Sequence, residues 1–197
     1  MKKITLLLLS ALVSVVASAA VGDVFVSGNY KYQITTEATS TEVSGAGEAT
    51  VLGFSTTASA ADQANVAFAQ YFQKDGKMYI VTAIAPNAFS NNTNITSVSI
   101  KGAVAKVGMS AFYGCSNLTK VSLGSVTTLD NYAFAFCTSL TSVKIPDTLT
   151  SINNSAFDGC TALESYVVSE SNSNYSSYDG ALYNKKQTPL VRMPAAK

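Results

Sequence analysis

Apolar and polar positions recur with a single period through the middle of the chain. The pair Ala-Phe recurs at four places in one register, where its phenylalanines are separated by 23, 22 and 23 residues (Phe89, Phe112, Phe134 and Phe157). Columns of apolar or small residues five and eight positions before each phenylalanine, and three, six, nine and eleven positions after it, keep the same register. This recurrence predicts an array of about four stacked units of 22–23 residues over positions 81–168.

Each unit is predicted to contain a short extended strand. In the segment Leu140–Ile145, the alternation of apolar and polar residues places Val143 and Ile145 on one face and Ser142 and Lys144 on the other. A strand of this length does not survive alone, so it is expected to pair with the same strand of the neighbouring unit. The inward residues would then form columns of a shared core, and the outward residues would form rows on one surface.

The rest of each unit is predicted to bend and return to the next strand. Gly108, Asp130 and Asn153 occupy matching positions and belong to residue types that tolerate a left-handed backbone, which indicates a tight bend there. Ala85 departs from this pattern in the first unit. The Ala-Phe-x-x-Cys segment that follows is expected to return as one helical or 3₁₀ turn, with the phenylalanine filling the centre.

The segment before the array, residues 20–80, is predicted to be a β-rich cap. Val24–Thr35 and Glu48–Phe54 carry strand-like patterns, and Asp75-Gly76 between two apolar runs is a hairpin signal. An open solenoid end exposes a layer of core, so this segment is expected to cover it and to lead into the first unit.

The segment after the array, residues 169–197, is predicted to close the other end. Ser169–Ser177 is rich in serine and asparagine and is expected to be a mobile polar loop. Gly180–Tyr183 and Leu190–Met193 are expected to form a hairpin that covers the last unit.

Residues 1–19 are predicted to be a secretory signal peptide. Lys2 and Lys3 form a basic start, Ile4–Val16 is apolar apart from three hydroxyl residues, and Ala17-Ser18-Ala19 is a small-residue cleavage site. The alternative, a transmembrane anchor, needs about 20 apolar residues, and this run is shorter. The chain is therefore expected to be secreted or held at the cell surface, with no membrane insertion after cleavage and no recognised anchor.

The repeat is similar to that of a known family. Residues 145–168, IPDTLTSINNSAFDGCTALESYVV, resemble the BspA-type, or Treponema pallidum-type, leucine-rich repeat, in which an Ile-Pro strand end precedes a turn and then Ala-Phe-x-x-Cys and Leu. Asn92 in place of the first cysteine departs from that pattern, as does the presence of proline after Ile145 alone. The resemblance and the period together predict a leucine-rich-repeat solenoid. It would be mainly β with short helical or 3₁₀ turns and stacked short parallel strands, between a β-rich N-terminal cap and a C-terminal hairpin cap.

Composition narrows the classes of function. The 197 residues include no histidine, and 13 Lys+Arg against 12 Asp+Glu give a net charge of +1. The absence of histidine excludes His-dependent catalytic triads and His-ligated metal sites, and no close pair of carboxylates suggests glycosidase chemistry. The balanced charge offers no electrostatic attraction for nucleic acid. We therefore expect no enzyme activity, no cofactor, no metal and no nucleic-acid partner.

The three cysteines have two competing interpretations. Cys115, Cys137 and Cys160 occupy one column of the repeat, which favours small buried packing residues. Metal binding or a reactive thiol is the alternative, but no C-x-x-C pair exists to support it. A disulfide between adjacent layers remains compatible with the strand spacing, and at most two of the three cysteines could form it.

The outward rows of the stacked strands are the predicted binding surface. They are rich in hydroxyl groups and contain two lysines; their members are Ser97, Ser99, Lys120, Ser122, Ser142, Lys144, Ser165 and Val167. Solenoids often bind partners on such a face, and a merely solvated face is the alternative.

The family resemblance implies a function for this surface. BspA-like proteins are surface or secreted proteins associated with adhesion, which implies non-enzymatic binding of a protein or glycan ligand on host matrix or cell surfaces. The alternative is a structural or accessory secreted protein without a specific ligand.

Overall fold

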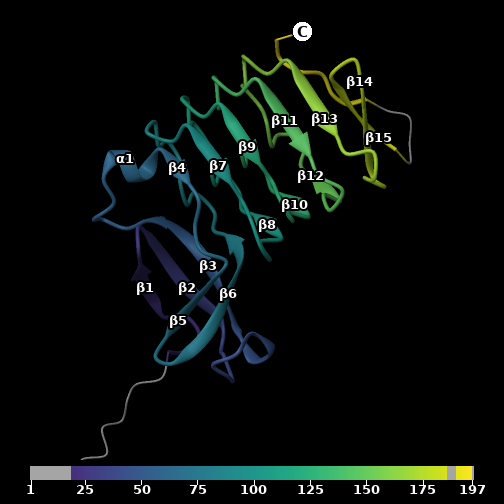
Figure 1. The fold of residues 1–197 in the computed structure, drawn as a ribbon. Coiled ribbons are helices and arrows are strands. Elements are labelled where there is room, and N and C mark those ends of the chain that lie inside the picture. The colour runs from purple at the N-terminus through teal and green to yellow at the C-terminus, as the bar shows by residue number, and fades with distance from the viewer. Residues whose placement is uncertain (1–18, 186–189, 197) are drawn as a thin grey trace, which may run out of the picture.

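A computed structural model describes residues 19–185 and 190–196 of the chain, so the predicted signal peptide lies outside the described residues except for Ala19. Short parallel strands stack side by side along the molecule, between a β-rich N-terminal region and a small C-terminal sheet (Figure 1). The predicted solenoid with terminal caps is confirmed.

Two antiparallel hairpins form most of the N-terminal cap. β1 pairs with β2 across the turn at Gly28, and β5 pairs with β6 across Asp75-Gly76, where the sequence predicts a hairpin. β2 also pairs with β3 in antiparallel fashion. The elements of this region are β1 (Val24–Ser27), β2 (Tyr30–Thr36), the 3₁₀ helix η1 (Val43–Gly45), β3 (Gly47–Phe54), α1 (Ala60–Gln63), β5 (Tyr71–Lys74) and β6 (Lys77–Ile84).

The long strand β6 joins the cap to the array. It lies parallel to β3, and its last residues, Ala83 and Ile84, pair with Lys106 and Val107 of the first short strand of the array. Cap and array therefore share one continuous sheet of order β1-β2-β3-β6-β8-β10-β12. Its array strands are β8 (Lys106–Val107), β10 (Thr128–Leu129) and β12 (Ser151–Ile152), which are parallel to one another.

A second, wholly parallel sheet carries the outward rows predicted from the sequence. Its order is β13-β11-β9-β7-β4, and its strands are β4 (Asn65–Val66), β7 (Ser97–Ser99), β9 (Lys120–Ser122), β11 (Ser142–Ile145) and β13 (Ser165–Val168). In β11, Val143 and Ile145 are buried and Ser142 and Lys144 are exposed, as the alternation predicts. β4 lies one layer before the first predicted strand, so the cap contributes a layer to this sheet.

A spine of stacked phenylalanines fills the centre of the array. Neighbouring rings of Phe89, Phe112, Phe134 and Phe157 have centroids 5.0, 5.0 and 5.7 Å apart and are inclined by 12°, 2° and 8°. The cysteine column lies beside this spine: each thiol is buried, unpaired with another, and donates a hydrogen bond to the phenylalanine carbonyl one layer earlier, at 3.1–3.3 Å. The cysteines thus hold the packing position that the repeat register predicts.

The third side of the array, which we call the turn face, consists of residues 86–92, 109–115, 131–137 and 154–160. In place of the one helical turn expected there, each segment forms successive tight turns. Alternate amides donate to carbonyl oxygens within the segment and to carbonyl oxygens of the next layer. The amide of Phe112, for example, donates to the carbonyl of Ala133 at 2.8 Å, whereas the amide of Tyr113 donates to that of Ser110 at 3.1 Å. The turn face is therefore hydrogen-bonded across layers like the two sheets.

The predicted left-handed bend is misplaced. Gly108, Asp130 and Asn153 do not have positive φ, whereas Ser110 and Tyr132, two residues further on in their units, have φ of 55° and 58°. Gly108 is needed for close approach, because a Cβ atom there would lie 2.7 Å from the backbone nitrogen of Pro86 in the layer below.

Hydroxyl side chains tie neighbouring layers together at the corners. The hydroxyl oxygens of Thr119, Thr127 and Thr150 donate to carbonyl oxygens of the preceding layer at 3.1, 3.0 and 3.2 Å. This use accounts for part of the unusual content of 25 serines and 20 threonines in a chain with 13% charged residues. The layers are therefore joined mainly by uncharged groups.

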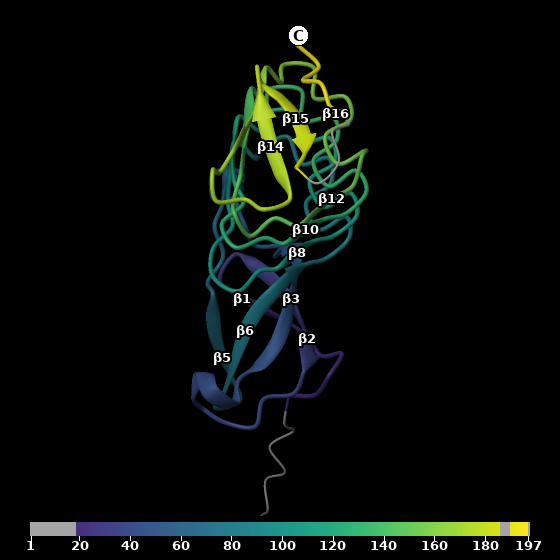
Figure 2. The same ribbon diagram turned by 90° about the vertical axis from the view of Figure 1, so that its right-hand side faces the viewer.

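A three-stranded antiparallel sheet forms the C-terminal cap (Figure 2). Its strands are β14 (Tyr175–Tyr178), β15 (Ala181–Asn184) and β16 (Leu190–Arg192). β15 and β16 form the predicted hairpin, and β14 pairs with β15 as a third antiparallel strand.

The loop expected over Ser169–Ser177 is shorter and better held than predicted. Asn172 within it is fully buried: its side-chain amide donates to the carbonyl of Leu149 at 3.0 Å, and its side-chain oxygen accepts from the amide of Tyr175 at 2.8 Å. The prediction of a mobile loop was wrong here because a polar side chain can replace backbone partners inside the fold.

Across residues 19–185 and 190–196, no helix is both long and apolar enough to cross a membrane.

Candidate functional site

The predicted surface residues form two rows on the second sheet. Strand register links Ser99, Ser122, Lys144 and Val167 into one continuous row across β7, β9, β11 and β13. In the other row, register pairs Ser97 with Lys120 and Ser142 with Ser165. We call these the distal row and the proximal row. Because backbone strands set both rows, their side chains sit on a rigid frame about 4.8 Å apart.

The proximal row continues onto the cap. The hydroxyl of Ser97 donates to the side-chain oxygen of Asn65 in β4 at 2.5 Å. Asn65 thus extends the polar surface by one layer, which the sequence did not reveal because β4 lies outside the recognisable repeat.

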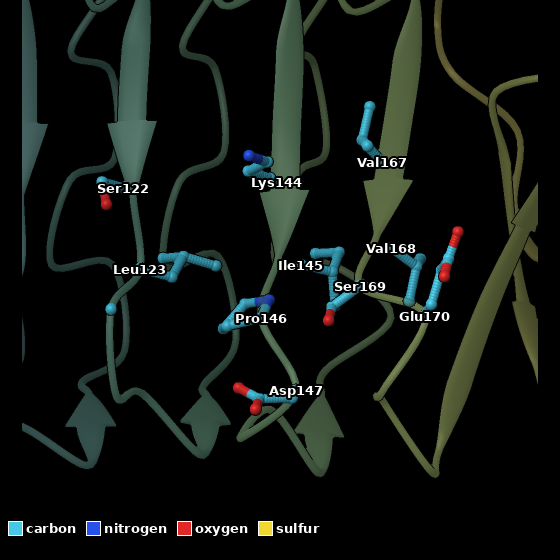
Figure 3. Close-up of a pocket in the computed structure, with 11 residues that line it drawn as sticks. Ser122, Leu123, Lys144, Ile145, Pro146, Asp147, Val167, Val168, Ser169 and Glu170 are labelled. Carbon is cyan, nitrogen blue, oxygen red and sulfur yellow. The ribbon is translucent and has the colours of Figure 1, made fainter.

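The distal row opens into a groove where β9, β11 and β13 end. The groove has a volume of about 540 Å³. Three members of the distal row, Ser122, Lys144 and Val167, line it (Figure 3). Its other lining residues come from the strand ends and the loops after them: Leu123, Gly124, Ile145, Pro146, Asp147, Val168, Ser169 and Glu170.

The groove has an apolar floor and charged margins. Val167 exposes 48% of its surface, although it stands in a row that otherwise carries serine or lysine. Lys144 lies on the strand side, whereas Asp147 and Glu170 come from the loops beyond the strand ends (Figure 3). The margins therefore carry positive charge on one side and negative charge on the other.

Local sequence explains the hollow. Proline at position 146 has no amide hydrogen for the strand ladder, so β11 ends at Ile145. At the matching position of the preceding layer stands Gly124, which has φ of 52° and where an added Cβ atom would clash with the carbonyl oxygen of Ile100. The Ile-Pro strand end was the signal in the sequence, but the two loop carboxylates become part of the site only once neighbouring layers stack.

The structure gathers some predicted site residues and leaves others apart. Ser122, Lys144 and Val167 meet in the groove, whereas Ser97, Ser99, Lys120, Ser142 and Ser165 lie on the same sheet outside it. Of the last five, Lys120 and Ser142 are exposed and the other three are half-buried.

The described part of the chain holds no group of three or more His, Cys, Asp or Glu arranged to hold a metal ion. What the groove offers is shape, apolar contact and charge.

Comparison with known families decides the class of repeat. The profile of the BspA type leucine rich repeat region matches residues 79–188 with six copies. This chain belongs to the BspA-type leucine-rich-repeat family. The match begins in β6 and runs beyond the last predicted unit into the C-terminal cap.

Solved structures of several bacterial proteins, leucine-rich repeat proteins among them, share the fold. A leucine-rich repeat protein from Bacteroides capillosus has a TM-score of 0.61 at 23% identity, over 74% of this chain and 98% of that one. The pneumococcal vaccine antigen PcpA has a TM-score of 0.56 at 17% identity, over 88% of this chain and 56% of that one. The leucine-rich repeat protein of T. pallidum has a TM-score of 0.50 at 20% identity, over 72% and 70%. Comparison with curated proteins gives no match.

Proposed function

We propose that this BspA-type protein is an exported, non-enzymatic interaction protein that binds host-matrix or cell-surface proteins. The groove at the end of the distal row would be the main contact. The observation that carries the proposal is the exposed Val167 beside Lys144, above an apolar floor and opposite two carboxylates. Apolar anchoring sites with a few polar groups around them are typical of specific recognition surfaces.

The size of the groove sets what it can bind. A volume of about 540 Å³ accommodates a few side chains of a partner and not a whole element of its structure. The affinity of one such contact would be modest. Many copies displayed together on a surface would strengthen it through effective concentration, which suits adhesion.

The first nineteen residues support export, because their basic start, apolar stretch and small-residue cleavage site are typical of a secretory signal. The mature protein would then meet its partners outside the cell.

Surface plasmon resonance tests the proposal directly. Residues 20–197 would be passed over immobilised fibronectin and fibrinogen, alongside the double variant Lys144→Gln with Val167→Ser. Serine is what this row carries in two other layers, and the Lys144 side chain is exposed, so the variant should fold normally. We expect binding by the natural chain and a loss of at least about tenfold in the variant, near the loss of a 1.4 kcal/mol contact.

Lys106→Gln is the matched control. Lys106 is an exposed lysine of β8 on the other sheet, paired with Asp130 at 2.9 Å. Its removal changes net charge equally and should leave binding unchanged. Equal losses in the two variants would point to nonspecific charge attraction. No binding of the natural chain at about 100 μM would overturn the proposal in favour of a structural role.

A further inference from the structure

The third unit of the array carries aromatic residues at two positions of the turn face where other units carry small or polar residues. Two positions after the spine phenylalanine stand Asn91, Gly114, Phe136 and Gly159, with φ of 58°, 69°, 58° and 68°. Two positions before it stand Asn87, Ser110 and Tyr132, with φ of 57°, 55° and 58°. Phe136 and Tyr132 therefore both adopt the left-handed conformation that asparagine and glycine accept more readily.

This arrangement is unfavourable for the backbone and is only partly offset by burial. A left-handed conformation is unfavourable for an ordinary residue because its Cβ approaches the following carbonyl oxygen. Burying the rings could offset that, yet Phe136 and Tyr132 remain 46% and 43% exposed. Strained residues of this kind gather at functional sites.

The neighbouring layers hold the Phe136 ring in place. On one side its centroid lies 5.1 Å from that of Tyr113, with the two rings inclined by 55°. On the other side it covers Gly159, where an added Cβ would come within 2.6 Å of the ring carbon Cδ1. Glycine at position 159 thus makes room for the ring, which is fixed at the surface and not sunk into the core.

Polar groups lie in the layer next to the ring. The amide of Phe136 donates to the carbonyl of Asp158 at 2.6 Å, and the Asp158 carboxylate pairs with Arg192 at 2.5 Å. Arg192 also donates to the carbonyl of Asn154. Phe136 therefore lies one layer away from Asp158, whose carboxylate holds Arg192, and both charged groups are partly open to solvent.

We propose that Phe136, with Tyr113 in contact with its ring and the exposed Tyr132 in the same unit, is a carbohydrate-binding platform that stacks on one face of a neutral hexopyranose unit of a glycan. The C–H bonds of a sugar ring are positively polarised by the oxygens on each carbon, and the negative face of an aromatic ring attracts them. Asp158 and Arg192 would accept from and donate to the sugar hydroxyls. This site lies on the turn face and is independent of the groove.

The available area favours a sugar over a protein partner. An aromatic side chain buries about 150–250 Å² when covered completely, so Phe136 and Tyr132 at their exposures offer about 200 Å² together. A stable protein interface needs about 800 Å² on each partner. One sugar unit needs no more than the face of a ring.

The other units supply the variants that test the platform. Phe136→Asn and Tyr132→Ser introduce residues that the same columns carry in other units, and asparagine also adopts the left-handed conformation more readily than phenylalanine. Saturation-transfer NMR with methyl β-D-galactopyranoside and with cellohexaose would measure sugar contact, and thermal melting would measure stability. We expect the natural chain to transfer saturation to the C–H protons of at least one sugar. Each variant should lose at least about tenfold in affinity with an unchanged or higher Tm.

Two controls complete the experiment. Phe136→Tyr retains the ring and should retain binding, and Val167→Ser in the groove should leave it unchanged. If the aromatic residues serve only stability, Phe136→Asn lowers the Tm and leaves sugar contact as it was, which overturns the proposal. No transfer from the natural chain to either sugar at about 10 mM overturns it as well.

Discussion

The phenolic oxygen of Tyr175 accepts the amide hydrogen of Ile152 at 2.9 Å. Ile152 belongs to β12, the last strand of its sheet, so this hydrogen bond satisfies a donor that an open edge would leave unpaired. At the other end of the array, Tyr30 accepts the amide hydrogen of Ala67, just after the terminal strand β4, also at 2.9 Å. The two caps therefore complete the hydrogen bonding of the end layers as well as covering their apolar faces.

Removing the Tyr175 hydroxyl should destabilise the C-terminal end. In Tyr175→Phe the amide of Ile152 loses its partner while the ring keeps its packing, so the free energy of unfolding should fall by about 0.5–1.5 kcal/mol. Urea unfolding followed by circular dichroism measures the change. Tyr178→Phe is the control, because Tyr178 is 78% exposed and its replacement should have no measurable effect. Equal results for the two variants would contradict the edge-closing role.

Truncation of the phenylalanine spine should be severe. Phe134 is fully buried and stacks on Phe112 and on Phe157, so Phe134→Ala opens a cavity between three layers. The loss should be about 3–5 kcal/mol and should unfold the array. Thermal melting checks this, with Lys144→Ala on the exposed face as a control that leaves the Tm nearly unchanged. A thermally silent Phe134→Ala would show that the assigned register is wrong.

The three thiols should resist modification in the folded protein, because each cysteine is fully buried and out of reach of an alkylating agent. Burial raises the pKa of Cys115 to about 12, and a hydrogen bond to Cys160 together with burial raises the pKa of Cys137. At pH 8 the thiolate fraction of Cys115 is then about one in ten thousand, and alkylating agents react with the thiolate. Mass spectrometry after treatment with iodoacetamide should show no label on the native chain and three labels after denaturation without reductant. Two missing labels in the denatured sample would reveal a disulfide.

Alkaline pH should weaken the N-terminal cap. Burial raises the pKa of Tyr32 to about 12 and also raises that of Tyr30, against a usual value of 10.0. The folded state thus keeps a proton that the unfolded state releases, so the stability contributed by Tyr32 is complete below pH 10 and is lost as pH rises towards 12. The loss should reach about 3 kcal/mol at most.

Urea unfolding at a series of pH values between 8 and 12 measures the pH dependence, and absorbance at 295 nm follows tyrosinate formation. Tyr32→Phe cannot ionise and should show a shallower decline over the same range. An identical decline in that variant would assign the effect to other groups.

The sequence predicted the repeat, the inward and outward faces and the phenylalanine and cysteine columns. All of these follow from the residue pattern of one unit and from its recurrence along the chain. It did not predict features that arise between units. Gly108 looked like a left-handed bend, whereas its role is to let Pro86 of the layer below approach closely. Asp147 and Glu170 lie 23 residues apart in the sequence and meet at one groove only because their layers stack.

The turn face gives a second example of a feature that the sequence alone did not reveal. Phe136 occupies a column in which the sequence offers asparagine and glycine, and that contrast was visible in the aligned units. Its significance was not visible, because only the backbone angle shows that this column is left-handed. An aromatic residue in a loop is ordinary, whereas one held at a φ of 58° and half-exposed is not.

The spacing of the layers, visible in the phenylalanine spine, also restricts which partners can bind along the array. Its neighbouring rings are 5.0–5.7 Å apart, and the strands that carry the distal row are about 4.8 Å apart. An extended peptide presents side chains on one face only about every 6.6 Å, so a peptide crossing the strands falls out of step within two or three layers. A partner that contacts more of the row must repeat with the same spacing as the layers of the solenoid. Otherwise it must bind as a folded surface whose contacts do not depend on that spacing.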